Sequence, residues 1–257
     1  TTEIYTLSLH DALPISHKYV AREVKAVREN VGGIEIANYA KHQFKGPGAR
    51  DFLNYVLAGR LPSPGRINLT PMLTSKGKLY GDLTIACMED EYFILFGSGL
   101  MQEAHRRWFE KRLPENGVSY ANRSDDYHGV AISGPKSREL LKRITRDDVS
   151  KGSFRFRDIR QTYVGDVPAI IIRMSFSGEL GYEIYCKPHY LIKLAENIEE
   201  AGEDLGFCWY GARASLSMRL EKQWGVWTLD FRPDFTAAES GLDAFIEIGR
   251  ASCRERV

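Results

Sequence analysis

A nine-residue pattern occurs twice in this chain, and it limits the folds available to the sequence. The two copies are KGPGARDFL and SGPKSRELL, and their first glycines, Gly46 and Gly134, lie 88 positions apart. Each copy follows a short apolar run and precedes an amphipathic stretch. Pro47 and Pro135 therefore fit the first position of a helix, where a missing backbone N–H costs no hydrogen bond. A strand, a Gly-Pro turn and a helix that recur in this way predict two similar α+β units.

Hydrophobic periodicity predicts further strands and helices between and after the copies. Between them we expect strands over residues 79–87 and 92–97, and a helix over residues 104–112. After them we expect strands over residues 158–163, 169–176 and 182–186, and helices over residues 189–205 and 211–222. Gly165-Asp166 forms the predicted hairpin turn, and Gly206 is placed to end a helix. No low-complexity linker interrupts residues 18–246, so we expect one packed body.

The two ends of the chain differ from the rest. TTEIYTLSLHDALPIS, at residues 1–16, has neither the basic start nor the sustained apolar stretch of a secretory signal. It resembles a translated sequencing adapter, and so does EIGRASCRERV at residues 247–257. We therefore expect both segments to be non-native, and the natural sequence to continue past them.

Bulk properties argue against several classes of function. The formal net charge is +1 and no apolar run approaches the roughly 18 residues that span a bilayer, so neither nucleic acid nor a membrane is an expected partner. Scattered cysteines and the lack of a secretory signal favour a reducing compartment, either the cytoplasm or, in a eukaryote, the mitochondrial matrix. The cysteines are Cys87, Cys186, Cys208 and Cys253.

Common catalytic and metal-binding signatures are missing from the sequence. It contains no GxGxxG, no phosphate-loop GK(S/T), no HExxH and no GxSxG. Its histidines are not spaced as metal ligands, so we expect them to have core or surface roles and we expect no metal site. The histidines are His10, His17, His42, His105, His128 and His189.

The first of two glycine-punctuated acidic segments is LTSKGKLYGDLTIA, in which a polar turn leads into a strand. Alternation places Asp82 on one face with Tyr80, opposite Leu79, Leu83 and Ile85. A carboxylate at a pocket wall can have its pKa tuned by desolvation and by nearby cations, which suits an acid–base group. The pattern alone also allows a solvent-facing strand acid.

The second segment is SFSGELGYEIY, in which a glycine turn with Glu179 enters a strand that holds Glu183. An ionised glutamate is a pure acceptor with two oxygens, so Glu183 could accept two hydrogen bonds from the edge of a flat, amidine-like heterocycle. A surface acid on a hairpin is the alternative.

Four segments, taken in order, resemble the motifs of one family. LTSKGKLYGDLTI resembles its Lys/Asn-x-Gly-Gly-x-x-x-Asp-Leu segment, and SFSGELGYEIY resembles its Tyr-Thr-Gly-Glu-x-Gly-x-Glu segment. MRLEK, at residues 218–222, resembles its Arg-Leu-Glu helix, and FTAAESGLD, at residues 235–243, resembles its Thr-Pro-x-Glu-x-Gly-Leu turn. With the two Gly-Pro copies, these segments are similar to the glycine-cleavage T-protein family of aminomethyltransferases across almost all of residues 18–246.

The resemblance implies an α+β fold of two similar antiparallel-sheet-plus-helix units within residues 17–246. One unit would span about 47–127, and the other would combine 17–46 with 128–246. T-proteins end in a small barrel that helps close the folate cavity, and this chain stops before such a barrel. We therefore expect weakened tetrahydrofolate binding.

The resemblance also assigns roles to the two acids. Asp82 matches the family's catalytic acid, which lies beside the folate nitrogens that receive the one-carbon unit and helps to position or deprotonate the attacking amine. Glu183 matches the glutamate that binds the pterin, and Glu179 is expected to shape the turn.

Three further residues are expected beside the folate. Tyr80 is expected there because it shares a face with Asp82. Phe176 stands where the family has Tyr, so it lacks the hydroxyl. The family's pterin-contacting arginine lies four positions before the Arg of Arg-Leu-Glu, where this chain has Ser215, so Arg213 is the nearest candidate.

The resemblance is closer to the folate-binding half of dimethylglycine and sarcosine dehydrogenases. It rests on residues 23–53, on the Gly81-Asp82 pair, and on MRLEK with Trp224 and Trp227. In those proteins an FAD domain precedes this module and oxidises an N-methyl amine, and the imine product passes to tetrahydrofolate. The implied partners are thus an FAD domain in cis, outside this chain, and a small one-carbon donor.

Other functions stay open on sequence alone. One is a stand-alone T-protein or a demethylase that acts on another methylated donor. Another is a non-catalytic folate-binding accessory protein for iron–sulfur assembly, which is disfavoured because its Lys-Gly-Cys-Tyr-x-Gly-Gln-Glu segment is absent. A purely structural interaction module is the third. A GxGxxG strand–helix start a few hundred residues upstream would support the oxidase-linked function.

Overall fold

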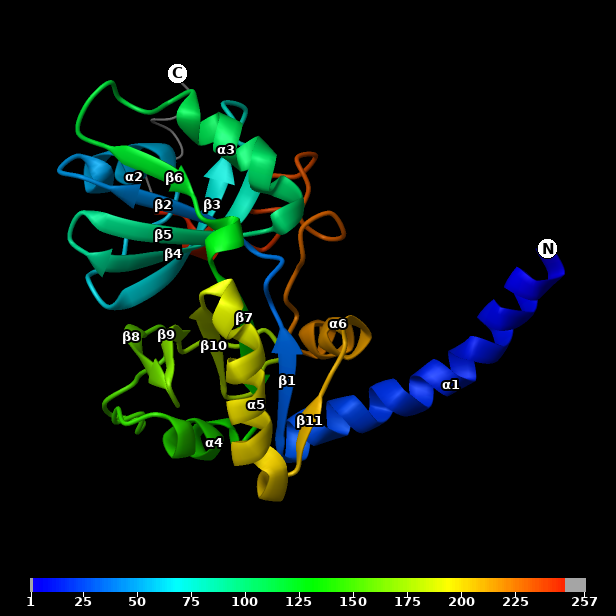
Figure 1. Ribbon diagram of the computed structural model, residues 1–257. Coiled ribbons are helices and arrows are strands. Elements are labelled where there is room, and N and C mark those ends of the chain that lie inside the picture. The colour runs from blue at the N-terminus through cyan, green and yellow to red at the C-terminus, as the bar shows by residue number, and fades with distance from the viewer. Residues whose placement is uncertain (1, 248–257) are drawn as a thin grey trace.

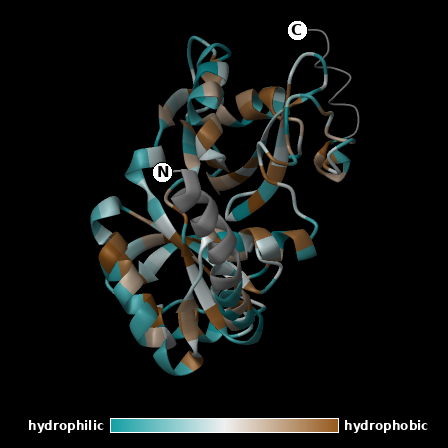
Figure 2. Cartoon of the chain, turned by 90° about the vertical axis from the view of Figure 1, so that its right-hand side faces the viewer, coloured by the Kyte–Doolittle hydropathy of each residue, from teal (hydrophilic) through white to brown (hydrophobic). Residues whose placement is uncertain are grey.

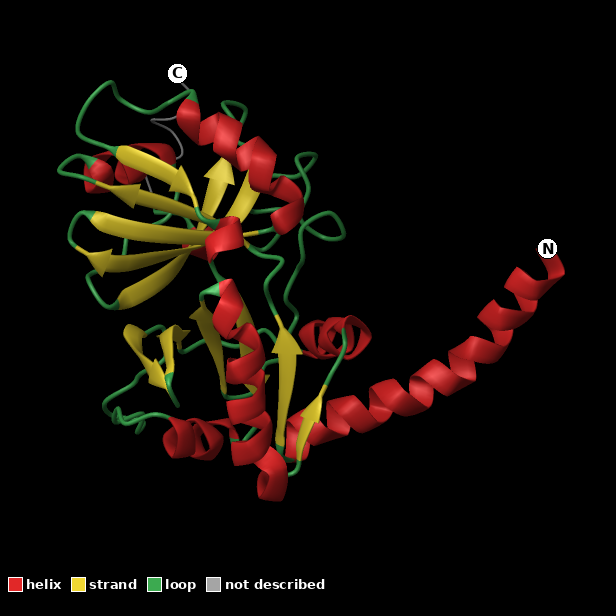
Figure 3. Ribbon diagram, viewed as in Figure 1, coloured by secondary structure: helices red, strands yellow, loops and turns green. Residues whose placement is uncertain are grey.

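Two β-sheets lie face to face in the computed structural model, and helices cover their outer faces (Figure 1, Figure 3). The structure describes the backbone of residues 2–247 and the side chains of residues 16–247. Sheet A has the strand order β11 (Phe207–Trp209), β1 (Val31–Glu35), β7 (His128–Ser133), β10 (Gly181–Cys186), β9 (Val167–Ile172) and β8 (Ile159–Val164). Sheet B has the order β3 (Arg66–Leu73), β4 (Leu79–Glu89), β5 (Tyr92–Gly97), β2 (Ala40–Lys45) and β6 (Ser119–Asn122). The two are open, mainly antiparallel sheets, and β1 and β11 form a parallel pair.

Six α-helices lie within the described residues. They are α1 (Thr2–Glu29), α2 (Ala49–Val56), α3 (Gln102–Glu110), α4 (Ser137–Ile144), α5 (Leu191–Gly202) and α6 (Ala212–Glu221). One-turn 3-10 helices lie at Gly99–Met101, Ser124–Asp126, Pro188–Tyr190, Glu203–Leu205 and Asp243–Phe245. The N-terminal part of α1 extends away from the two sheets, while its C-terminal end packs beside α6 (Figure 1).

Strand alternation explains how each sheet packs on both faces. In β10, Tyr182 and Ile184 belong to the cluster that α4 and α5 cover, whereas Tyr185 belongs to the cluster between the sheets. Successive side chains of a strand point to opposite faces, so Glu183 shares the inner face with Tyr185. All six residues of β10 are buried, because this central strand has an apolar layer on each side.

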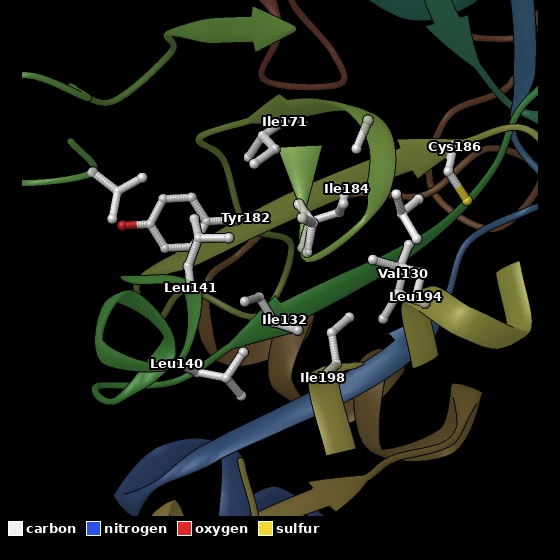
Figure 4. Packing of buried hydrophobic residues seen from close by; sticks show 14 of the residues in the cluster. Val130, Ile132, Leu140, Leu141, Ile171, Tyr182, Ile184, Cys186, Leu194 and Ile198 are labelled. Atoms are coloured by element: carbon white, nitrogen blue, oxygen red, sulfur yellow. The ribbon is translucent and has the colours of Figure 1, made fainter. Parts of the chain in front are cut away.

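The outer core of sheet A is built from leucines and isoleucines of the two covering helices. Figure 4 shows Leu140 and Leu141 of α4, with Leu194 and Ile198 of α5, packed against side chains of β7, β9 and β10. Leu194 and Ile198 lie four residues apart on one face of α5, which is the spacing that the sequence predicts for a core-facing helix.

The two sheets are joined by an apolar layer and at one pair of edges. Phe96 of β5 and Tyr185 of β10 stack with their ring centroids 4.7 Å apart. At the edges, Arg66 of β3 forms an ion pair with Asp158, just before β8, and the N–H of Ile67 donates to the carbonyl of Arg157 over 2.9 Å. These contacts hold the inner faces, and the groups on them, in register.

The repeated sequence forms the same turn twice. Gly46 and Gly134 have φ of 120° and 134°, and in each copy the N–H three residues later donates to the glycine carbonyl. A Cβ at either glycine would lie 2.4 Å from a backbone carbonyl oxygen, so no other residue fits. The prolines do not occupy the first helical position as predicted. They lie in the turn, because the helices begin at Ala49 and Ser137.

The strands divide between the sheets at a different place from the predicted boundary near residue 46. β2 pairs with β5 and β6, so residues 40–45 belong to sheet B and not to the unit that contains β1. The segment after α6 also differs, because Trp227, Phe231 and Leu242 pack with Leu79 at the start of β4. The prediction grouped β2 with β1 because the two strands are neighbours in the chain. The backbone hydrogen bonds instead place β2 in sheet B.

Several predicted elements are confirmed. β5 coincides with the predicted strand, and Gly165-Asp166 turns between β8 and β9. Gly206 ends the helical segment in the left-handed conformation with φ of 73°. Periodicity does not predict β1, β3, β6 or β11. The first three are interrupted by glycine, proline or polar residues, and β11 has only three residues.

Hydropathy follows this layering along the described chain. Brown, hydrophobic bands lie on the strands, and the loops and outer helix turns are largely teal (Figure 2). Among the described residues, no helix combines the length and the apolar character needed to cross a bilayer.

Candidate active site

Asp82 lies on the inner face of sheet B. Its neighbours Gly81 and Leu83 face α2 and α3, because a Cβ on Gly81 would touch His105 of α3 and Leu83 packs in the outer cluster. Alternation then directs Asp82 toward sheet A, on the same face as Ala86, which is part of the layer between the sheets. The prediction that Asp82 and Leu83 lie on opposite faces of the strand is therefore confirmed.

Tyr80 does not share that face, which corrects the prediction. Met72 pairs with Gly81 and Leu73 pairs with Leu79, so Tyr80 is an extra residue in a β-bulge. Its ring lies 5.9 Å from that of His105 and 6.3 Å from that of Trp108, on the α3 side. A bulge inserts one residue and breaks the period of two, which no alternation count can reveal.

Burial raises the pKa of Asp82 to about 7. The side chain is half-buried, and the one opposing influence is a hydrogen bond from its own backbone N–H. A desolvated carboxyl without a cationic partner keeps its proton up to near neutral pH. Asp82 can therefore both accept and return a proton under ordinary conditions.

Glu183 lies on the facing strand of sheet A and is 7% exposed. Its Oε2 accepts a hydrogen bond of 2.8 Å from the hydroxyl of Tyr185, and no described group donates to Oε1. Burial raises the pKa of Glu183 to about 7, although the Tyr185 hydroxyl and the charges of Lys222 and Lys41 oppose the increase. One carboxyl oxygen is thus held in place while the other can accept a hydrogen bond.

Two lysines supply positive charge near Glu183. Lys41 is fully buried, and its Nζ donates to the carbonyl of Ala37 over 2.8 Å. Burial lowers the pKa of Lys41 to about 8, against the charges of Glu35, Asp125 and Glu183. Burial also lowers the pKa of Lys222, against the charge of Glu183. The sequence patterns do not identify Lys41, because a lysine in a strand is ordinarily a solvated residue.

Tyr39 lies in the connection from β1 to β2, and its hydroxyl is influenced by the charges of both carboxyls. Burial raises the pKa of its phenol, and the negative charges of Glu183 and Asp82 both add to the increase. The Tyr39 hydroxyl is thus within electrostatic reach of both acids, which lie on the inner faces of the two facing sheets. Tyr39 carries no motif, so only the fold identifies it.

The loop before β10 is held by residues from distant segments. Arg28 of α1 donates to Glu179 over 2.7 Å and to the carbonyl of Ser177 over 3.0 Å. Lys222 donates to the carbonyl of Ser175 over 2.6 Å. These contacts agree with a turn-shaping role for Glu179, and they place half-buried Phe176 in a fixed loop beside β10.

The sequence motifs meet in pairs. MRLEK joins the loop before β10 through Lys222, and FTAAESGLD joins the turn before β4 through an ion pair of 3.5 Å between Lys78 and Glu239. Within FTAAESGLD, the Glu239 carboxylate accepts from the N–H of Thr236 over 2.7 Å. Segments far apart in the chain therefore support the two strands that carry Asp82 and Glu183.

Arg213 and Arg219 lie on α6 in different surroundings. Arg213 is exposed on the first turn of the helix. Arg219 is 6% exposed, donates to the carbonyl of Trp224 over 2.8 Å and pairs with Asp230 at 2.9 Å. The arginine of MRLEK thus fixes the segment after α6, which the motif alone does not reveal.

The described residues contain no group of three or more His, Cys, Asp or Glu side chains arranged to hold a metal ion. Cys87 and Cys186 are buried free thiols, and Cys208 is a half-buried one. Cys253 lies outside the described residues.

Comparison with known proteins defines the class. Residues 8–250 match the model of the GCVT N-terminal domain. The fold superposes on the crystal structure of glycine cleavage system aminomethyltransferase T from Bartonella henselae with a TM-score of 0.81 at 21% identity, over 92% of this chain and 63% of that one. The structure is an aminomethyltransferase-like domain. The chain belongs to the GCVT N-terminal domain family, which confirms the resemblance drawn from the four motifs.

Curated relatives include two kinds of enzyme. Dimethylglycine dehydrogenase, mitochondrial, of Rattus norvegicus is 32% identical over 235 residues, which are 90% of this chain and 27% of that protein. Aminomethyltransferase of Natranaerobius thermophilus is 29% identical over 240 residues, which are 93% of this chain and 65% of that protein. The chain thus spans about a quarter of one relative and less than two thirds of the other.

Proposed function

We propose that this chain is a tetrahydrofolate-binding module that transfers a one-carbon unit from an amine donor to the folate. Asp82 is the acid–base group, and Glu183 binds the pterin edge. The observation that carries the proposal is the placement of the two carboxyls on the facing inner sides of the two sheets, both within electrostatic reach of Tyr39 and both with pKa values near 7. A proton-transfer group is most effective when its pKa lies near the working pH.

The donor set on the inner faces fits a reduced pterin. Glu183 has one oxygen fixed by Tyr185 and one without a described donor, which suits an N–H of a flat heterocycle. Phe176, in the adjacent fixed loop, offers an apolar surface to such a ring. We retain Arg213 as a candidate contact for the folate, and we leave Tyr80 out because its ring faces α3.

Bound tetrahydrofolate would supply the amine that takes up the one-carbon unit. Asp82, when ionised, accepts the proton that this amine loses as its nitrogen bonds to the carbon. The same proton then passes from Asp82 to the departing donor amine, so the carboxyl returns to its starting state. With a pKa near 7, neither transfer is strongly uphill at neutral pH.

We further propose that the parent protein is a dimethylglycine or sarcosine dehydrogenase-like enzyme, with an FAD domain in cis that oxidises the N-methyl amine. The similarity to dimethylglycine dehydrogenase over 90% of this chain supports this assignment. A stand-alone aminomethyltransferase is the second candidate, favoured by the fold match to aminomethyltransferase T. The upstream reading frame decides between them, since only the first requires a dinucleotide-binding segment.

Saturation-transfer NMR with tetrahydrofolate tests binding, because it detects weak ligands. We expect the chain to give transfer to the pterin protons, and Glu183→Gln to weaken binding by roughly tenfold through the loss of a charged acceptor. Glu200→Gln, an exposed acid of α5, is the matched control and should bind normally. Absence of transfer in the unmodified chain, or equal binding by Glu183→Gln, would overturn the proposal.

A catalytic module and a folate-binding accessory protein differ in one measurement. In the parent protein, Asp82→Asn should lower the rate of methylene-tetrahydrofolate formation by roughly 10²–10⁴-fold if Asp82 moves the proton. If the rate is unchanged, the accessory role is the correct one.

A further inference from the structure

Two buried histidines lie behind the strand that carries Asp82. His42 of β2 is 0% exposed and His105 of α3 is 1% exposed, and their ring centroids are 6.0 Å apart. Burial lowers the pKa of both rings, that of His42 to about 3. Both are therefore neutral at physiological pH, and each ring has one nitrogen with a proton and one without.

The partners of each ring define its tautomer. His105 Nε2 lies 2.9 Å from the carbonyl oxygen of Tyr80, which can only accept, so Nε2 carries the proton and Nδ1 is an acceptor. His42 Nδ1 lies 2.9 Å from the hydroxyl of Tyr120. When that hydroxyl donates, His42 Nε2 carries the proton. His42 Nε2 and His105 Nδ1 are both buried, and neither atom has a hydrogen-bond partner among the described residues.

His105 contacts the backbone of the two residues before Asp82. Its Nε2 donates to the carbonyl of Tyr80, the extra residue of the bulge. A Cβ on Gly81 would lie 2.6 Å from the same nitrogen, so the ring packs directly against that glycine. The peptide groups before Asp82 are thus fixed by one side chain from the outer face of sheet B.

We propose that His105 is a positioning residue for Asp82. Its Nε2–H holds the Tyr80 carbonyl in the bulge, and its ring holds Gly81, so that the Asp82 carboxyl stays on the inner face. The proposal rests on the function proposed above, because Asp82 is the group that is positioned.

Two substitutions of His105 distinguish a role in positioning Asp82 from a role in packing the core. His105→Gln keeps an N–H donor close to the place of Nε2, whereas His105→Leu keeps apolar volume and removes the donor. Val56→Ala is the stability control, because Val56 belongs to the same outer cluster but lies on α2 and not on α3. Urea unfolding of each variant shows how much stability it loses.

The first readout is the titration of Asp82 in the chain itself, followed by NMR of aspartate labelled with ¹³C at the carboxyl and assigned with Asp82→Asn. We expect His105→Leu to lower the pKa of Asp82 by about one unit, because a released carboxyl becomes hydrated. His105→Gln should keep the original titration, and so should Val56→Ala. A folded His105→Leu with an unchanged titration, or a His105→Gln that behaves like His105→Leu, would overturn the proposal.

The second readout is transfer to tetrahydrofolate at saturating and limiting folate. His105→Leu should lower kcat by roughly tenfold with little change in KM, since proton transfer depends on the placement of Asp82, and His105→Gln should restore it. An equal loss in both variants would contradict the positioning role. The Asp82 titration needs no folate, so an unmodified chain that transfers nothing would contradict only the function, while the titration would still decide the role of His105.

Discussion

The carboxyl of Glu183 accepts a hydrogen bond of 2.8 Å from the hydroxyl of Tyr185, two residues along the same strand and on the same inner face. Both side chains are buried, and Tyr185 also stacks on Phe96 of the facing sheet. The orientation of the glutamate therefore depends on a residue that belongs to the contact between the sheets.

Tyr185→Phe should raise the pKa of Glu183 above its present value of about 7, because the hydroxyl favours the ionised form. At pH 8 we expect roughly tenfold weaker folate binding from the loss of this hydrogen bond to a charged group. Carboxyl NMR and ligand titration measure the two effects. Tyr182→Phe, on the opposite face of the strand, is the control, and an equal response in both variants would exclude a specific role for Tyr185.

Asp82→Asn should lower the rate of one-carbon transfer by roughly 10²–10⁴-fold, the usual contribution of a general acid–base group. Stability at pH 8 should not fall, because the ionised carboxyl is the form that burial disfavours. Initial rates and urea unfolding measure the two quantities. Asp166→Asn, in the exposed turn between β8 and β9, should change neither; a loss of rate in that variant would point to a general effect of charge.

The contribution of Glu183 to stability should fall as pH rises from about 4.5 to 7. The pKa of Glu183 is about 7 in the folded protein against 4.5 for a free side chain, so the folded state binds more protons in this window. Its contribution is fully present below the lower pKa, and the loss is on the order of 3 kcal/mol at about 1.4 kcal/mol per pKa unit. Urea unfolding at pH 5 and pH 8 should show that Glu183→Gln lacks this loss, while the opposite contribution of buried His42 and His105 is the same in both proteins. The same difference in both proteins would refute this linkage.

Gly46→Ala and Gly134→Ala should each destabilise the fold by roughly 2–4 kcal/mol, as expected for a strained backbone with a steric clash. Each glycine has φ above 100° and a carbonyl oxygen 2.4 Å from the position of an added Cβ. Gly152→Ala, which meets no atom within 4 Å, should be nearly neutral. Thermal unfolding tests the contrast, and similar midpoints for all three variants would disprove it.

Local sequence patterns predicted the turns and the helix end that depend only on neighbouring residues. The Gly-Pro copies give two turns with the same hydrogen bond, and Gly206 ends its helical segment as predicted. The prediction that Tyr80 faces the same way as Asp82 was wrong, because a bulge in β4 inserts one residue. The boundary near residue 46 differed because β2 pairs with β5 and β6 rather than with its neighbour in the chain.

The sequence by itself determined the family, the paired α+β units and the two acids on which the proposed function rests, because short motifs and alternation are properties of neighbouring residues. Only the tertiary structure decided that Asp82 and Glu183 lie on facing inner sides of two sheets, that Tyr39 is within electrostatic reach of both, and that Lys41 is buried and influenced by the charge of Glu183. The physical reason is desolvation. The pKa of a carboxyl depends on what surrounds it, and here the surroundings come from two sheets that meet only when the chain has folded.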